Sequence, residues 1–422
     1  MSMAFAPISM PRLSRSVSVS GQRKEAVSFR KVNTKHDATT YECCSYQREI
    51  SDLDVLYSSF QKAKKGSDWK PQVQRFEINL LSELVRLRRE LNNRTYALSP
   101  LNQFVLRERG KTRVISGDHI RDRVVKRALC DEVLIPSIRK YLIHDNGASL
   151  KGKGISFTRR RLEVHLRRYY REHGNEGYVY LADYSKFFDN IQHEKLMGMF
   201  RCIIDDNLAL WLLEKVLKQA EIDVSYMSDS EYAKRYNTVF DSLAHKEIDK
   251  ALLTGEKYLR KHMNIGDQVA QVAGIFYPHR LDNYIKIVEG VKYYARYMDD
   301  SYVIHKDKGY LLELADRIEQ EALKNGIFIN KRKTHICRLS DYWRFLQIQY
   351  ALTNTGRIIK KIHPKRLTDM RRKLKKLVRI MGEQEFVSYY NAWFRNHYRL
   401  MSKKQRNNMD ALVEALRRET HD

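Results

Sequence analysis

Two short apolar stretches of the chain end in carboxylates. One is Val179-Tyr-Leu-Ala-Asp183, and the other, Ala295-Arg-Tyr-Met-Asp-Asp300, ends in the pair Asp299-Asp300. Strand ends and tight turns hold a side chain on a rigid scaffold, so two such elements side by side can bring three carboxylates together. Carboxylate oxygens are ligands that Mg²⁺ prefers, and paired ions promote in-line phosphoryl transfer. The pattern therefore predicts a two-metal site for phosphoryl transfer.

An Asp-Asp pair is also an ordinary turn sequence. The chain contains a second pair, Asp205-Asp206, within Cys-Ile-Ile-Asp-Asp-Asn, a setting typical of a helix start. Spacing alone leaves both interpretations of Asp299-Asp300 open.

The charge balance indicates a polyanionic partner. The 422 residues include 78 Lys and Arg but 51 Asp and Glu, a net charge of +27. A phosphate backbone would relieve the resulting self-repulsion, so nucleic acid is the expected partner. The 26 Tyr and 15 Phe provide apolar cores, which argues against a disordered chain. No apolar run approaches the ~18 residues that span a bilayer, so no membrane is expected.

Cysteine usage indicates a reducing compartment. The five cysteines are scattered without a CxxC spacing, so we expect a cytoplasmic protein rather than a disulfide scaffold. Residues 1–24 are acid-free and rich in Ser and Arg, which fits either a basic arm or a transit peptide.

Hydrophobic periodicity predicts alternating helices and hairpins. A helix is expected from Arg121 to Ile135, ended by Pro136, and a single apolar helix from Asn264 to Tyr284. Residues 192–260 are expected to be mainly helical. The other expected elements are helices in 53–91, 158–172 and 310–324, strands at 178–182 and 293–304, hairpins at 102–115 and 342–350, and basic helices over the last 60 residues.

Several segments, in order, resemble the motifs of reverse transcriptases. Tyr297-Met-Asp-Asp300 resembles motif C, and Asp183-Tyr-Ser-Lys-Phe-Phe-Asp-Asn-Ile191 resembles motif A. The further similar segments are Asn264–Gln271 (motif B), Gly326–Thr334 (motif D), Arg344–Ile348 (a loose motif E), and Lys111–Arg113 with Ile120–Leu129, which resemble the fingers of group II intron enzymes.

This resemblance implies an α+β right-hand polymerase fold with fingers, a palm built on an antiparallel sheet, and a helical thumb. The implied domains are a basic extension (1–45), fingers (46–175), a palm (176–350) with a helical insertion at about 192–263, and a thumb (351–422). The implied activity is RNA-directed DNA synthesis with two Mg²⁺ ions, for which Mn²⁺ can substitute. Its partners would be an RNA template and primer, dNTPs and an RNA–DNA duplex product.

The resemblance also assigns roles to individual residues. Asp183, Asp299 and Asp300 would be the catalytic and metal-binding carboxylates. Phe188 would clash with a ribose 2′-hydroxyl and so select deoxyribose, while Asp189 is expected to be structural. The other implied nucleotide-binding residues are Lys111, Arg113, Gln271 and Lys333, with Lys331 as a rival to Lys333 for protonating the pyrophosphate.

The basic segment 361–380 is expected to line a thumb helix that contacts the duplex backbone without reading sequence. The residues proposed for this contact are Arg371, Arg372, Lys375 and Lys376. A solvated basic face is the alternative interpretation.

Departures from the reverse transcriptase motifs limit the classes of enzyme that the chain resembles. Ala270 replaces the Ser usual in motif B, and 192–263 is longer than a minimal enzyme needs. No HNH, integrase or RNase H residues follow, so the resemblance favours compact bacterial classes: retron, diversity-generating, abortive-infection and other phage-defence enzymes. Such enzymes imply a dedicated structured noncoding RNA. The alternatives are template-independent or RNA-product synthesis on the same fold, and an idle RNA-binding scaffold.

Overall fold

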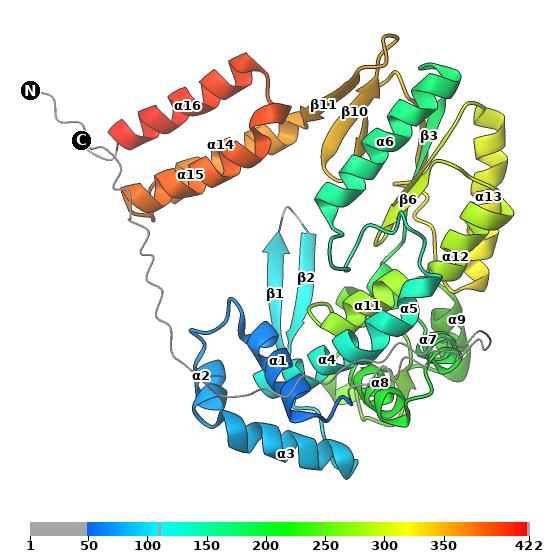
Figure 1. The fold of residues 1–422 in the computed structure, drawn as a ribbon, viewed down its shortest axis with the longest axis vertical. Coiled ribbons are helices and arrows are strands. Elements are labelled where there is room, and N and C mark those ends of the chain that lie inside the picture. Colours follow the sequence, from blue (N-terminus) through cyan, green and yellow to red (C-terminus); the bar gives the residue numbers. More distant parts are fainter. Residues whose placement is uncertain (1–48, 109–110, 246, 420–422) are drawn as a thin grey trace, which may run out of the picture. The chain divides into compact units, whose positions relative to one another are not determined.

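The computed structural model describes residues 49–108, 111–245 and 247–419 (Figure 1). At Glu108 and Lys111 only the backbone is described. The expected extension at 1–45 lies outside the described residues.

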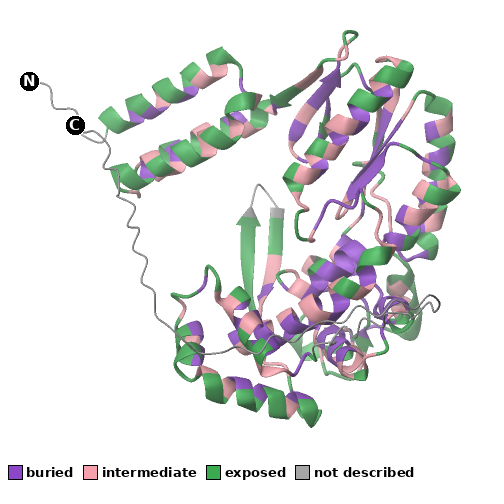
Figure 2. Cartoon of the chain, in the orientation of Figure 1, coloured by how far each residue is buried: buried purple, intermediate pink, exposed green. Residues whose placement is uncertain are grey.

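A four-stranded antiparallel sheet forms the centre of the fold. Its strand order is β6-β7-β3-β8. The strands are β3 (Tyr178–Asp183), β6 (Tyr294–Tyr297), β7 (Asp300–His305) and β8 (His335–Arg338). β3 and β7 are buried along their middles on both faces, which explains their near-continuous apolar sequences (Figure 2).

Helices cover both faces of this sheet. On one face, α6 (Ile155–His173) packs with Val179 and Tyr302; on the other, α11 (Gln268–Phe276) and α13 (Lys308–Lys324) share a core with Tyr180 and Val303. A second sheet, in the order β11-β10-β9, adds to the core on the α6 face. Its strands are β9 (Trp343–Phe345), β10 (Ile348–Leu352) and β11 (Ile358–Ile362).

The N-terminal part consists of helices and an exposed hairpin. Its elements are α1 (Leu53–Lys64), α2 (Pro71–Ile78), α3 (Leu80–Asn92), β1 (Asn102–Glu108), β2 (Lys111–Gly117) and α4 (Ile120–Ala128). The expectation that Pro136 ends the helix after Arg121 was wrong. The chain continues through a π-helical turn, η1 (Leu129–Leu134), into α5 (Ile135–Ile138) and η2 (Arg139–Tyr141). Pro136 lies in the first turn of α5, where a missing N–H is tolerated.

The segment between β3 and α11 is mainly helical, as expected, but it also contains a short two-stranded ladder. Its elements are η3 (Phe187–Asn190), α7 (His193–Arg201), α8 (Asn207–Gln219), β4 (Ile222–Asp223), α9 (Asp229–Asn237), α10 (Ser242–His245), η4 (Lys250–Leu252) and β5 (Tyr258–Leu259). Asp206 accepts hydrogen bonds from two backbone amides at the start of α8, which confirms the helix-start interpretation.

The predicted single helix over 264–284 is divided in two. α11 ends at Phe276, and α12 (His279–Asn283) begins after Pro278, which cannot continue a helical hydrogen-bond ladder. α12 continues into η5 (Tyr284–Val288).

The C-terminal helices begin at Pro364, after β11. They are α14 (Pro364–Leu377), α15 (Glu383–His397) with the 3₁₀ turn η6 (Tyr398–Leu400), and α16 (Lys403–Arg418). They pack around their own apolar core, which includes Leu374, Phe386 and Met409. No helix of the described residues is long and apolar enough to cross a membrane.

Candidate functional site: carboxylates at one edge of the central sheet

The sheet register brings the sequence-predicted aspartates together. Asp183, the last residue of β3, is the direct cross-strand partner of Asp300, the first residue of β7. Directly opposed residues on antiparallel strands project to the same face with Cβ atoms about 4.5–5.5 Å apart. Asp299 lies next to Asp300 in the turn that joins β6 to β7. The three carboxylates therefore belong to one end of the sheet.

The turn that carries Asp299 is strained. Tyr297 pairs with Asp300, so Met298 and Asp299 form a two-residue connection. Met298 has a φ of 55°, in the left-handed region that side chains other than glycine rarely adopt. Such backbone strain persists only where surrounding structure holds it in place.

Arg296 holds the turn in this conformation. Its guanidinium donates hydrogen bonds to the carbonyl oxygens of Met298 (2.9 Å) and of Ile275 at the end of α11 (2.9 Å). It also pairs with Asp282 of α12 at 2.6 Å, and both side chains are fully buried. Burial lowers the pKa of Arg296, but the Asp282 carboxylate outweighs burial and the net pKa is raised. Arg296 thus remains charged and connects the turn to α11 and α12.

Lys333 contacts the Asp183 carboxylate. Its ammonium donates to Asp183 Oδ2 at 2.6 Å, and the Asn330 amide donates to the same oxygen at 3.3 Å. Lys331 instead pairs with Glu319 of α13 at 2.9 Å. Of the two lysines that the sequence left as rivals, Lys333 is therefore the one that reaches the carboxylate site.

The three carboxylates could bind a divalent cation, because their oxygens are suitable ligands and their backbone positions lie at one end of the sheet. Within the described ranges, no three His, Cys, Asp or Glu side chains already converge as metal ligands. The Asp183 carboxylate pairs with the Lys333 ammonium. An ion bound there would compete with the lysine ammonium for the same oxygens.

Phe188 lies beside the carboxylate turn. A β-carbon added to Gly274 of α11 would lie 3.1 Å from Phe188 Cε1 and 3.4 Å from the Met298 sulfur. The Phe188 ring, the glycine surface of α11 and the turn are therefore in close contact. The carbonyl oxygen of Phe188 also accepts a hydrogen bond from Met263 N at 2.8 Å. Phe188 is fixed by its neighbours and only partly buried.

Asp189 and Asn190 anchor η3 to the segment that follows. Asp189 accepts hydrogen bonds from Ser242 Oγ (2.8 Å) and pairs with His262 (3.0 Å). Burial raises the pKa of Asp189, but His262 and Ser242 outweigh burial and the net pKa is lowered. Asn190 exchanges hydrogen bonds with the backbone of Phe240. These contacts are structural, in line with the expectation for Asp189.

The motif B segment packs directly on β2. Ser116 N donates to the Ile265 carbonyl oxygen at 2.9 Å, and Gly266, with a φ of 118°, approaches Ser116 so closely that a β-carbon would clash. Nearby, the buried Lys126 pairs with Asp118 (2.7 Å) and with Asp267 (2.8 Å). The β1–β2 hairpin is thereby attached to the start of α11.

The remaining predicted site residues lie on α11, on the β1–β2 hairpin and on α14. Gln271 is exposed on α11, and Arg113 is exposed on β2 opposite Leu106. The side chain of Lys111 lies outside the described residues. Arg371, Arg372, Lys375 and Lys376 lie on α14, alongside the buried stripe of Leu367, Met370 and Leu374.

Sequence reasoning missed the residues that support the site. Arg296 directly precedes the Tyr-Met-Asp-Asp turn, and a charged residue within an apolar strand could have raised the question of its partner. Asp282, Ser242 and His262 gave no local signal, because their partners lie at least 14 residues away in the chain.

The sequence of the chain was compared with those of known protein families and proteins. A family model described as reverse transcriptase (RNA-dependent DNA polymerase) matches residues 103–350, more than half of the chain. The matched segment contains all three aspartates and runs from β1 into β10. No curated protein matches the chain.

Proposed function

This chain belongs to the reverse transcriptase family, and from that premise we propose that it copies a structured RNA into cDNA at Asp183, Asp299 and Asp300. The enzyme is an RNA-directed DNA polymerase, a nucleotidyltransferase that uses an RNA template and dNTPs. The observation that carries the residue assignment is the cross-strand pairing of Asp183 with Asp300.

The family generally uses divalent metal ions, and we assign two Mg²⁺ ions, replaceable by Mn²⁺, to the three carboxylates. When bound, the ions supply activation of the attacking 3′-hydroxyl and stabilisation of the leaving phosphate oxygen. The protein itself contributes a rigid turn that positions two of the carboxylates. Arg296 holds the turn through Met298, so Asp299 and Asp300 need no reorganisation when substrate arrives.

Phe188 is proposed to select deoxyribose. Its contact with Gly274 and Met298 leaves the ring little room to move away from a 2′-hydroxyl. Lys333 is proposed to protonate the leaving pyrophosphate, since its ammonium already reaches the Asp183 carboxylate. Lys111, Arg113 and Gln271 are proposed to contact the incoming nucleotide, with guanidinium and ammonium groups facing its phosphates.

We assign 46–175 as fingers, 176–350 as palm with the insertion at about 192–263, and 351–422 as thumb. The thumb cations Arg371, Arg372, Lys375 and Lys376 would contact the RNA–DNA duplex backbone. Replacing all four by Gln would flatten the salt dependence of duplex binding by roughly two to four log–log units.

We propose that the protein is a compact bacterial enzyme of the phage-defence type. It would work in the cytoplasm with a dedicated noncoding RNA. The support for this proposal is the order of the motifs, their resemblance to the bacterial classes and the net charge of +27.

Primer extension tests the proposed function. Purified protein, a DNA primer on an RNA template and Mg²⁺ are combined with dNTPs or with NTPs. Template-dependent extension with dNTPs is expected, with EDTA as the control. Extension with NTPs alone, or a product whose sequence ignores the template, would contradict the proposal and favour RNA-product or template-independent synthesis.

A further inference from the structure

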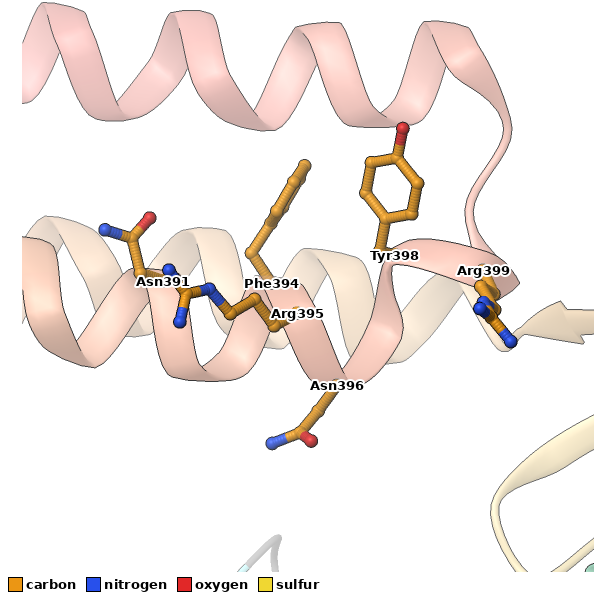
Figure 3. Close-up of a pocket in the computed structure, with 6 residues that line it drawn as sticks. All are labelled: Asn391, Phe394, Arg395, Asn396, Tyr398 and Arg399. Atoms are coloured by element: carbon orange, nitrogen blue, oxygen red, sulfur yellow. The ribbon is translucent and has the colours of Figure 1, made fainter. Parts of the chain in front are cut away.

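The C-terminal helices contain a pocket of about 470 Å³ on α15 and η6 (Figure 3). It is lined by Asn391, Phe394, Arg395, Asn396, Tyr398 and Arg399. Phe394 and Tyr398 point from α15 and η6 toward α16. The lining thus combines aromatic rings, guanidinium groups and amides.

Tyr398 is fixed in place and still accessible. The Arg406 guanidinium of α16 lies 4.2 Å from the Tyr398 ring centroid, and Phe394 meets the ring edge-to-face at 5.6 Å. Tyr398 nevertheless remains 47% exposed. A ring already held by a cation and a neighbouring ring can stack on a base through its exposed part without a large loss of side-chain entropy on binding.

Cations and amides also line the pocket. Arg395 and Arg399 are exposed, four residues apart, and in the part of the chain that the structure describes neither has an ion pair with a carboxylate. Guanidinium groups match phosphate oxygens in geometry and charge. Asn391 and Asn396 offer both a donor and an acceptor, which suits the hydrogen-bonding edge of a nucleobase.

We propose that this pocket binds one unpaired RNA nucleotide, with the base stacked on Tyr398 and its phosphates at Arg395 and Arg399. An unpaired base suits the pocket because the bases of a duplex are already stacked on one another and cannot enter it. This site is separate from the cations of α14, whose proposed partner is the duplex backbone. It goes beyond the polymerase function, because a nucleotide held on α15 is remote in the chain from the carboxylates.

Fluorescence anisotropy on the full chain tests the pocket. The probes are a short fluorescein-labelled oligouridine and a blunt RNA–DNA duplex, each at one fixed salt concentration. Tyr398→Ala should weaken oligouridine binding about 5- to 150-fold, the loss expected from one stacked base, and leave duplex binding unchanged. Tyr398→Phe keeps the stacking face and should bind both probes as the wild type does.

Tyr342→Ala is the matched control. Tyr342 is 49% exposed and has the Lys361 ammonium 4.3 Å from its ring centroid, but it does not line the pocket. The control should bind both probes as the wild type does. The proposal is overturned if Tyr398→Ala binds oligouridine normally, or if it loses both probes in equal proportion.

The same measurements in an Asp300→Asn background separate this site from the polymerase function. A variant that cannot synthesise DNA should still show the Tyr398-dependent binding of oligouridine. The binding measurement therefore tests the pocket even if the protein fails to extend a primer.

Discussion

Arg296 Nη1 donates a hydrogen bond to the carbonyl oxygen of Met298 at 2.9 Å, and this contact joins a buried ion pair to the turn that carries Asp299 and Asp300. Met298 has the strained φ of 55° in that turn. The turn that carries Asp299 and Asp300 is therefore held by a charged side chain that itself lies inside the protein.

Asp282→Asn should be strongly destabilising. It removes the carboxylate that neutralises Arg296, and an unpaired buried guanidinium costs about 3–5 kcal/mol. Urea denaturation of the variant measures this loss. Lys324→Ala is the matched control, because the Lys324 side chain is exposed and its pair with Glu321 should contribute only about 0–1 kcal/mol. Equal costs for the two variants would contradict the role given to Arg296.

Phe188→Ala should raise incorporation of ribonucleotides relative to deoxyribonucleotides. The change removes a clash with the 2′-hydroxyl and adds no contact, so it should appear in the ratio of the two kcat/KM values. Single-nucleotide additions with dNTP and rNTP measure that ratio. Tyr342→Ala, an exposed aromatic on the loop before β9, is the control. An unchanged ratio in an active variant would remove Phe188 from sugar selection.

The placement of Asp183, Asp299 and Asp300 at one end of the sheet could be predicted from sequence, because strand ends and turns leave local signals. The same holds for the hairpin at 102–115, for Asp206 at the start of α8 and for the basic C-terminal helices. The supporting contacts could not be predicted. Arg296 with Asp282, and Lys126 with Asp267, are selected by the packing of distant elements. The prediction that Pro136 ends the helix was wrong because the effect of this proline depends on the π-helical turn before it, which no local sequence pattern reveals.

Lys333→Gln should slow nucleotide addition by about 10²-fold or more if its ammonium is the general acid for pyrophosphate. Rapid-quench measurement of one dNTP addition reports this step. Lys331→Gln is the matched control, because that lysine pairs with Glu319 instead of Asp183. A slow Lys331 variant with a normal Lys333 variant would reverse the assignment.

Lys261 should make stability depend on pH. It is fully buried and donates to the carbonyl oxygens of Tyr236 (3.0 Å) and Thr238 (2.6 Å). Burial lowers its pKa from 10.5 to about 7. Between these values the unfolded chain binds the proton and the folded chain does not, so this group's contribution to stability rises with pH from about 7 to about 10.5.

Lys261→Met removes that titration. The difference in Tm between wild type and variant should therefore shift in favour of the wild type as the pH increases from 7 to 10. Lys324→Met, at an exposed position, should show a constant difference. A pH-independent difference for Lys261→Met would contradict the assigned shift.

Single-nucleotide addition by Asp300→Asn and Asp183→Asn, with RNA affinity measured on the same samples, tests the central claim most directly. Both variants should lose DNA synthesis by at least about 10²-fold and bind the RNA template as the wild type does, because these carboxylates stabilise the transition state and not the template. The exposed Asp205→Asn should retain full synthesis. Normal synthesis by Asp300→Asn, or a loss of synthesis by Asp205→Asn, would contradict the account.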